Sequence, residues 1–194
     1  MKEHMNQIRK KIKKRMHPER YEHTLGVMYT AASLAMRYDE DIEKAMLAGL
    51  LHDCAKTEKY PPAELLALCR KYAIPVSESE EINPGLLHAK AGAFLAAKKY
   101  GVTDPEILDA IACHTTGKPA MSQLDKIIYI ADFIEPGRNE ADNLPRVRRL
   151  AFVNLDKCLL GILEDSLDYL KKKGNIIDPI TAKTYKYYKK QFKK

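Results

Sequence analysis

The segment "GLLHDCAK", residues 49–56, places a histidine and an aspartate side by side at the end of an otherwise apolar stretch. An unpaired carboxylate is strongly disfavoured inside a protein core. The negative charge of Asp53 therefore needs a cationic side chain, a hydrogen-bond network or a metal ion beside it. The segment "IIYIADFI" poses the same problem at Asp132.

The histidines offer the partners that two buried acids would need. His4 and His17 lie in the basic amino-terminal segment, whereas the other four are spread over different apolar stretches: His23, His52, His88 and His114. A single histidine on an apolar helix face is more often a hydrogen-bonded core residue than a ligand. Four imidazoles and two carboxylates together indicate one metal-centred pocket, because a divalent ion lets both buried acids stay ionised.

Helices must position these side chains, because nearly the whole chain has helical periodicity and no segment alternates as a strand would. Asp104 and Ser122 are expected to cap helices, and Gly101 to end one in the left-handed conformation. The segments 75–85 and 135–145 are expected to be irregular loops. The sequence predicts an all-α bundle with helices over 20–38, 41–56, 61–73, 86–101, 104–114, 122–134 and 146–173, and a last helix after Pro179.

The net charge of +7 is unevenly distributed. Residues 1–20 carry +6 and residues 171–194 carry +8, so the rest of the chain carries −7. We interpret the basic ends as solvated amphipathic helices rather than as surfaces for RNA, lipid or polyphosphate. We therefore expect one domain, 1–194, with a core of about 18–175 and basic helical ends.

The four cysteines are scattered, with no C-x-x-C pair: Cys54, Cys69, Cys113 and Cys158. This favours reduced thiols in the cytoplasm over disulfides or a cysteine zinc site. The longest apolar run, "AMLAGLL", is too short to cross a bilayer, and the charged amino terminus has no apolar signal core. We expect a cytoplasmic protein with no membrane partner and no stable nucleic-acid partner, and a homodimer is left open.

The order of the candidate residues resembles that of a known superfamily. His23, the pair His52–Asp53 and Asp132 match the H…HD…D order of the HD-domain metal-dependent phosphohydrolases, and His88 and His114 match additional histidines of its polynuclear branch. The blocks "HTLGV", "GLLHDCAK", "HAKAGA", "HTTGK" and "IYIADFIEPGR" are similar to those of its YqeK group, the symmetrical diadenosine tetraphosphate hydrolases.

This resemblance covers about residues 20–180 and implies both a fold and an activity. The fold is an all-α HD-domain helical bundle. The activity is the metal-dependent hydrolysis of diadenosine tetraphosphate, or a related dinucleoside polyphosphate, to two nucleoside diphosphates. The ending "IIDPITAKTYKYY" matches the Ile-x-Pro-x-Thr ending of this group more loosely.

The main ion is expected to be held by His23, His52, Asp53 and Asp132. Two imidazoles and two carboxylates suit Fe, Mn, Co or Zn, and the resemblance implies iron. Four protein ligands leave room for water and a phosphate oxygen on a six-coordinate ion. Water bound to such an ion is acidified and becomes the nucleophile, and Asp53 is placed to accept its proton or to bridge to a second ion.

The expected catalytic residues are Asp53, Lys56, His88 and His114. The two histidines either bind a second metal ion or donate hydrogen bonds to the phosphate and the leaving diphosphate; the one-metal character of the resembling enzymes favours the second role. Lys56, expected on the helix face of Asp53, either reaches a phosphate oxygen or complements the helix dipole. Arg138 either clamps a phosphate or pairs with Glu135 or Asp142.

Substrate contacts are expected from His23, Asp53, Cys54, Ala55, Lys56, His88, His114, Thr115, Asp132, Arg138, Asn175 and Ile176. Two alternatives stay open. One is another HD-type enzyme, a nucleotidase or phosphodiesterase acting on (d)NTPs or other nucleotides. The other is a non-catalytic nucleotide-binding regulator, which should have lost a metal ligand.

Overall fold

The computed structural model describes residues 2–139 and 141–192, and every regular element in these ranges is a helix. The all-α class predicted from the periodicity is confirmed. The helices are α1 (Lys2–Lys13), α2 (Pro18–Tyr38), α3 (Ile42–Leu51), α4 (Pro62–Lys71), α5 (Glu78–Ile82), the 3₁₀ helix η1 (Pro84–Leu87), α6 (His88–Tyr100), α7 (Pro105–Cys113), α8 (Gln123–Ile134), α9 (Leu144–Ala151), α10 (Leu155–Lys172) and α11 (Pro179–Gln191).

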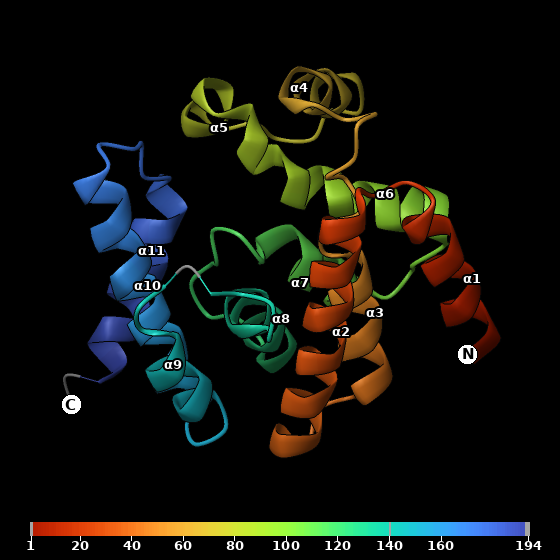
Figure 1. Cartoon of the computed structure of the whole chain (residues 1–194). Coiled ribbons are helices and arrows are strands. Elements are labelled where there is room, and N and C mark those ends of the chain that lie inside the picture. The colour runs from red at the N-terminus through yellow and green to blue at the C-terminus, as the bar shows by residue number, and fades with distance from the viewer. Residues whose placement is uncertain (1, 140, 193–194) are drawn as a thin grey trace.

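Helix α2 is the centre of the bundle and packs against α3 and α8, while α7 packs against α3, α6 and α8 (Figure 1). The contact between α2 and α3 is close, because α3 presents small residues to α2. A Cβ atom at Gly49 would lie only 2.9 Å from the Cα of Met28, and Ala45 and Ala48 are fully buried. This close approach fixes the end of α3 beside the amino-terminal half of α2.

Local signals set where α7 and α8 begin, and they follow the sequence prediction. The Asp104 carboxylate accepts a hydrogen bond from the Glu106 amide, and Ser122 and Asp125 form a reciprocal capping box. Gly101 ends α6 with φ 71°, a backbone conformation that glycine adopts without strain. These caps fix the positions of the two helices that carry polar residues toward the centre of the bundle.

The peripheral helices cover this centre. Ile8 and Ile12 bury α1 against it, and Tyr188 of α11 is 1% exposed. α9–α11 lie on one side of the bundle and α1 on the other, so the two basic helices α1 and α11 are far apart (Figure 1). Both basic ends form amphipathic helices, and the interpretation of their exposed faces as merely solvated stays a prediction. Among the described residues, no helix has the length and apolar character needed to span a membrane.

The predicted continuous helix over 146–173 is wrong, because the chain breaks between α9 and α10. The Asn154 side chain caps α10 by accepting from the Lys157 amide. The backbone oxygens freed at the break find tertiary partners. The Tyr38 hydroxyl donates to the Ala151 carbonyl (2.6 Å), and the Arg37 side chain donates to the Phe152 carbonyl (2.8 Å).

The predicted loop over 75–85 is also partly wrong, since it contains α5 and η1. Ser77 and Glu80 form a capping box that starts α5. The helix predicted over 41–56 is shorter than expected and ends at Leu51. Asp53 and Lys56 therefore lie in the turn after α3 and do not share a helix face.

Candidate metal and phosphate site

Five helices bring the four histidines and two aspartates to one place. His23 lies in α2 and Asp132 in α8, whereas His88 is the first residue of α6. The pair His52–Asp53 directly follows α3, and His114 directly follows α7. All except His23 and Asp132 are at most 4% exposed. The four histidines and two aspartates singled out in the sequence thus form one polar cluster, most of which is buried.

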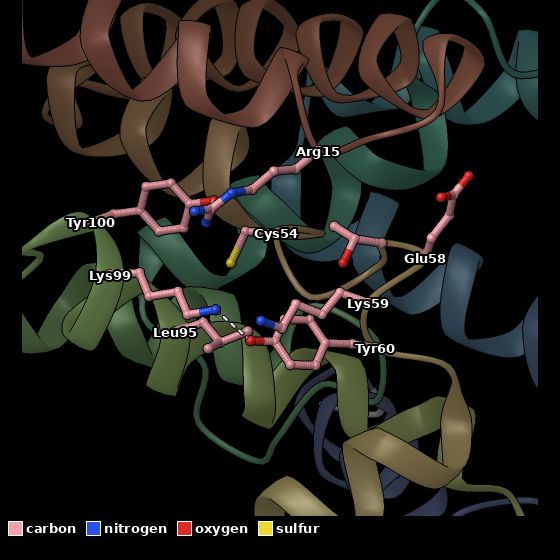
Figure 2. A pocket seen from close by; sticks show the side chains of 9 residues that line it. Arg15, Cys54, Glu58, Lys59, Tyr60, Leu95, Lys99 and Tyr100 are labelled. Carbon is pink, nitrogen blue, oxygen red and sulfur yellow. Dashed lines mark hydrogen bonds between the residues drawn. The ribbon is translucent and has the colours of Figure 1, made fainter.

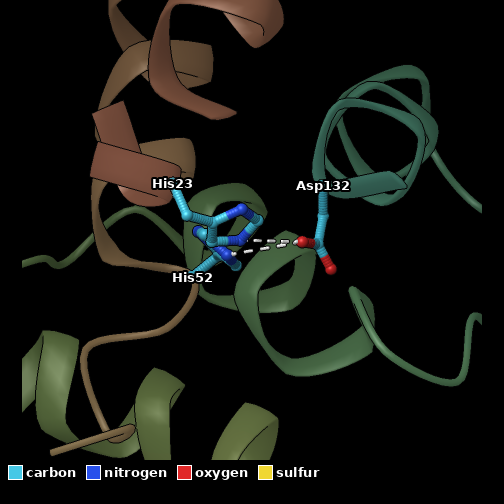
Figure 3. A group of neighbouring side chains, drawn as sticks. All are labelled: His23, His52 and Asp132. Atoms are coloured by element: carbon cyan, nitrogen blue, oxygen red, sulfur yellow. Dashed lines mark ion pairs between the residues drawn. The ribbon is translucent and has the colours of Figure 1, made fainter. Parts of the chain in front are cut away.

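Two groups of possible ligand atoms share His52. The first contains His23, His52 and Asp132, and the second contains His52, Asp53 and His114; in each, the ligand atoms lie within 4.8 Å of one another. Figure 3 shows His23 and His52 approaching Asp132, with distances of 3.0 and 3.8 Å from their Nε2 atoms to its Oδ1. Asp53 Oδ2 lies 3.4 Å from His52 Nε2 and 3.9 Å from His23 Nε2.

Backbone carbonyls fix which ring nitrogen faces the cluster. The Nδ1 atoms of three histidines lie within 2.8 Å of a carbonyl oxygen three residues earlier: His52 with Gly49, His88 with Gly85 and His114 with Ile111. A carbonyl oxygen only accepts, so each Nδ1 must carry the proton. In the neutral ring each Nε2 then presents a lone pair to the cluster, as a metal-ligating histidine does.

Several buried atoms in the cluster have no hydrogen-bond partner in the described part of the chain: His23 Nε2, His52 Nε2 and Asp53 Oδ1. His23 Nε2 and Asp132 Oδ1 approach to 3.0 Å but do not align as a hydrogen bond. Lone pairs this close repel unless a cation or a proton lies between them. Buried groups left unpaired are rare in proteins, and this donor set fits a divalent transition metal.

Asp53 has both cationic side chains and histidine rings around its carboxylate. Its Oδ2 accepts from Arg20 Nη1 at 3.1 Å, and its Oδ1 lies 3.2 Å from Lys56 Nζ. Burial alone would raise the pKa of this carboxyl, but His52, His114 and Lys56 hold it well below its usual range. The pKa of Asp132 is also lowered against the effect of its burial, by His23 and His52. Both acids are therefore carboxylates at neutral pH.

His88, His114 and Thr115 form the opposite wall. The two Nε2 atoms are 3.1 Å apart, and the Thr115 hydroxyl lies 3.0 Å from one and 3.1 Å from the other. Both Nε2 atoms are 3.5 Å from Asp53 Oδ1. Burial, helped by Lys56 and His114, lowers the pKa of His88 to about 3, so this ring is neutral at pH 7.

A comparison with models of known protein families identifies the family of this chain. Residues 20–137 match the HD domain, and this range contains every residue of the cluster. The chain belongs to the HD-domain family. HD-domain hydrolases bind divalent metal ions, and the His/Asp cluster of this HD domain is suited to one.

Several curated relatives match this chain over most of their own length. The symmetrical bis(5'-nucleosyl)-tetraphosphatase of Bacillus subtilis is 39% identical and covers 91% of this chain and 92% of its own. The enzyme of the same name from Halalkalibacterium halodurans is 39% identical over 90% and 91%. A Clostridium acetobutylicum crystal structure, described as a predicted HD superfamily hydrolase involved in NAD metabolism, has a TM-score of 0.91 and 39% identity, covering 96% of this chain and 97% of that one.

A cavity of about 330 Å³ borders the HD cluster, lined by His23, Arg20, Arg138 and Glu135 among others. Arg138 Nη2 donates to Asp132 Oδ1 at 2.8 Å. The expected alternatives for this arginine in the absence of a phosphate, Glu135 and Asp142, are therefore both wrong. The guanidinium remains 39% exposed toward the cavity.

Two residues beside the HD cluster were not predicted from the sequence. Arg20 lies one helical turn before His23 on α2, a spacing that puts both on one face. Glu135 directly follows α8, is 3% exposed, and lies 3.1 Å from His23 Nδ1. Its position one turn after Asp132 was the available signal, but the sequence analysis considered it only as a partner for Arg138.

The other predicted substrate contacts are two residues beside the cluster and two in the segment between α10 and α11. Cys54 points away from it and donates to the Gly92 carbonyl, and Ala55 is fully buried. Asn175 and Ile176 are exposed between α10 and α11, and no hydrogen bond or ion pair among the described residues joins their side chains to the cluster. Their roles in binding stay predictions.

Proposed function

We propose that this chain is a metal-dependent hydrolase that cleaves diadenosine tetraphosphate, and related dinucleoside polyphosphates, into two nucleoside diphosphates. The observation that carries the proposal is the 39% identity to the symmetrical bis(5'-nucleosyl)-tetraphosphatase of Bacillus subtilis over nearly the whole of both chains. The buried His/Asp cluster supplies the chemistry that this reaction needs.

His23, His52, Asp53 and Asp132 are the proposed metal ligands, and iron is the proposed ion. When bound, such an ion acidifies water to a nucleophile and polarises a phosphate oxygen. The Nε2 atoms of His23 and His52, which have no hydrogen-bond partner in the described part of the chain, support this set. The carbonyl-anchored tautomers support it too, because they present the unprotonated nitrogen.

Arg20, Lys56 and Arg138 are the proposed phosphate-binding cations. All three already contact a ligand carboxylate and are between 35% and 39% exposed, so each has free donors facing solvent. A polyphosphate chain brings several negative charges, and an arginine fork binds phosphate oxygens in a bidentate way. These residues would hold the substrate against the cluster while the two acids stay ionised.

His88, His114 and Thr115 are proposed to bind the attacked phosphate and the leaving diphosphate. In both histidines Nδ1 donates to a backbone carbonyl, so Nε2 is the only ring nitrogen that can exchange a proton with the substrate. A neutral His88 accepts a hydrogen bond at Nε2, and it becomes a donor when the substrate's negative charge favours the imidazolium. Asp53, whose Oδ1 lies 3.5 Å from the Nε2 atoms of both rings, is proposed to accept the proton of the attacking water.

The test combines metal analysis of the purified protein with identification of the products from diadenosine tetraphosphate. ADP as the only nucleotide product supports the proposal. AMP plus ATP, or no turnover of this substrate together with fast hydrolysis of a dNTP, would assign the site to another HD-type reaction. We also propose that the protein is cytoplasmic, that it has no stable nucleic-acid partner and that residues 1–194 form one domain. A homodimer is compatible with this proposal.

A further inference from the structure

A second cavity, of about 390 Å³, shares no lining residue with the cavity beside the histidine cluster (Figure 2). It lies between the end of the amino-terminal basic segment, the turn after α3 and the carboxyl-terminal end of α6. Cys54 contributes to its wall, while the preceding residue Asp53 belongs to the cluster. The turn after α3 thus lies between this cavity and the cluster.

Three cations line this second cavity: Arg15, Lys59 and Lys99. In the described part of the chain, no carboxylate lies within ion-pair distance of any of them, although Lys44, Lys118 and Lys126 all pair with acids elsewhere. The one acid in the lining, Glu58, is exposed. The cavity therefore carries an excess of positive charge that the protein itself does not neutralise.

Two tyrosines hold two of these cations in place. Arg15 lies over the Tyr100 ring, 6.0 Å from its centroid, with Nη1 3.4 Å from the hydroxyl. Lys99 lies over the Tyr60 ring, 4.8 Å from its centroid, and donates to its hydroxyl. Since each hydroxyl accepts from a cation, its own proton is left to donate. Tyr100 is 4% exposed, which makes this part of the wall rigid.

The volume and the charge together indicate the class of ligand. Small-molecule sites have volumes of roughly 300–1,000 Å³, and this cavity falls within that range. Three cations, two of which are held by tyrosines, and two hydroxyl donors match an anion with several negative charges and many acceptor oxygens. A chain of two or more phosphates fits this description. We propose that this cavity is a second binding site, separate from the cluster, for a molecule that carries such a phosphate chain.

The phosphate chain could come from an inorganic polyphosphate or from a nucleotide, and the probes separate these sources. Inorganic tripolyphosphate, pyrophosphate and ADP are each titrated into the full-length protein by calorimetry at fixed salt. A nucleotide site binds ADP more tightly than pyrophosphate, which has the same phosphate chain without the nucleoside. A site for inorganic phosphate chains binds tripolyphosphate most tightly and gains nothing from the nucleoside.

The decisive variant is Lys59→Gln/Lys99→Gln, since both lysines are exposed and their loss should leave the fold intact. We expect the second binding event to weaken at least tenfold in this variant. The matched control, Lys10→Gln/Lys11→Gln, removes the same charge from exposed positions of α1 and should change the affinity less than twofold. Arg15→Gln provides an independent test from a different side of the cavity.

The proposal is overturned if the cavity variants bind all three probes as the wild type does, or if the control weakens binding equally. A single binding event that disappears only in Arg138→Gln would also overturn it. The hydrolysis of diadenosine tetraphosphate is measured on the same variants. Because Lys59 and Lys99 lie outside the cluster, failure of the cavity proposal leaves that activity in place, and failure of the proposed reaction leaves the titrations interpretable.

Discussion

The buried carboxylate of Glu135 lies 3.1 Å from Nδ1 of His23, on the side of the ring away from Asp132. Its other oxygen accepts from the Gly137 amide at 2.6 Å. Gly26 leaves room for this side chain, because a Cβ atom there would come within 2.4 Å of Glu135 Oε2. A carboxylate that receives Nδ1–H fixes the ring orientation and makes Nε2 a stronger ligand.

Glu135→Gln should therefore weaken metal binding by roughly 10–100-fold. The amide loses the negative charge and places an NH₂ group against either His23 or the Gly137 amide. Affinity is measured by competition with a chelator, and helical circular dichroism checks the fold. Glu22→Gln, an exposed neighbour of His23 on α2, is the control and should bind metal as the wild type does. Equal affinities in the two variants would remove Glu135 from this role.

Loss of a proposed ligand should abolish hydrolysis without unfolding the bundle. His52→Ala and Asp53→Ala each remove a group that contacts several others of the cluster, so no neighbouring side chain can replace it. Turnover of diadenosine tetraphosphate should fall to the background rate, while the helical circular dichroism signal is retained. Substantial residual turnover in either variant contradicts the assignment of the cluster as the catalytic site.

Arg138→Ala should mainly raise KM, by about tenfold, which corresponds to about 1.4 kcal/mol of substrate binding. The guanidinium is part-exposed toward the cavity and is not itself a proposed ligand. Arg149→Ala, at an exposed position of α9, is the control and should leave KM unchanged. A variant whose kcat falls while its KM stays constant would show that Arg138 acts on Asp132 rather than on the substrate.

The lowered pKa of His88 predicts how the metal-free protein loses stability in acid. In the unfolded chain a histidine takes up a proton near pH 6.5, whereas the folded ring resists protonation down to about pH 3. Between these values the unfolded state binds the extra proton. The free energy of unfolding should therefore fall as the pH drops below 6.5, by up to about 1.4 kcal/mol per pH unit for this one group.

Urea unfolding between pH 7 and 5, with a chelator present, measures this slope. His88→Gln should flatten it, while His4→Gln, at an exposed position of α1, should not. The raised pKa of His52 has the opposite effect and stabilises the folded state as the pH falls toward 6.5. Because the wild type and His88→Gln both contain His52, the difference between their slopes still reports His88. Identical slopes for His88→Gln and the wild type would mean that the folded ring takes up a proton as readily as the unfolded chain does.

Much of the fold could be predicted because local residues determine the helix ends. Asp104, Ser122 and Gly101 act through their immediate neighbours, so their effects can be read from sequence alone. The break between α9 and α10 could not be read in this way. It has no proline or glycine, and its free carbonyls are satisfied by Tyr38 and Arg37 from a distant helix.

The residues of the candidate site also differ in whether they could be predicted from the sequence. The histidines and aspartates were recognisable because a buried polar residue on an apolar helix needs an explanation wherever its partner lies. Arg20 was missed because a charged residue at a helix surface needs no explanation, and Glu135 because it begins a segment expected to be an irregular loop. Only the three-dimensional arrangement, in which they contact Asp53 and His23, distinguishes them from ordinary surface charges.

The proposed ligands come from α2, from the turn after α3 and from α8. A chain leaving the ribosome folds its amino-terminal part first, yet it lacks the full ligand set until Asp132 has emerged. The first helices must therefore associate through their apolar faces alone. The Gly49 carbonyl can already orient His52 at that stage, whereas the Glu135 carboxylate that orients His23 emerges only after Asp132. The metal ion can therefore bind to the full ligand set only after α8 has been synthesised, so metal binding cannot direct the association of the earlier helices.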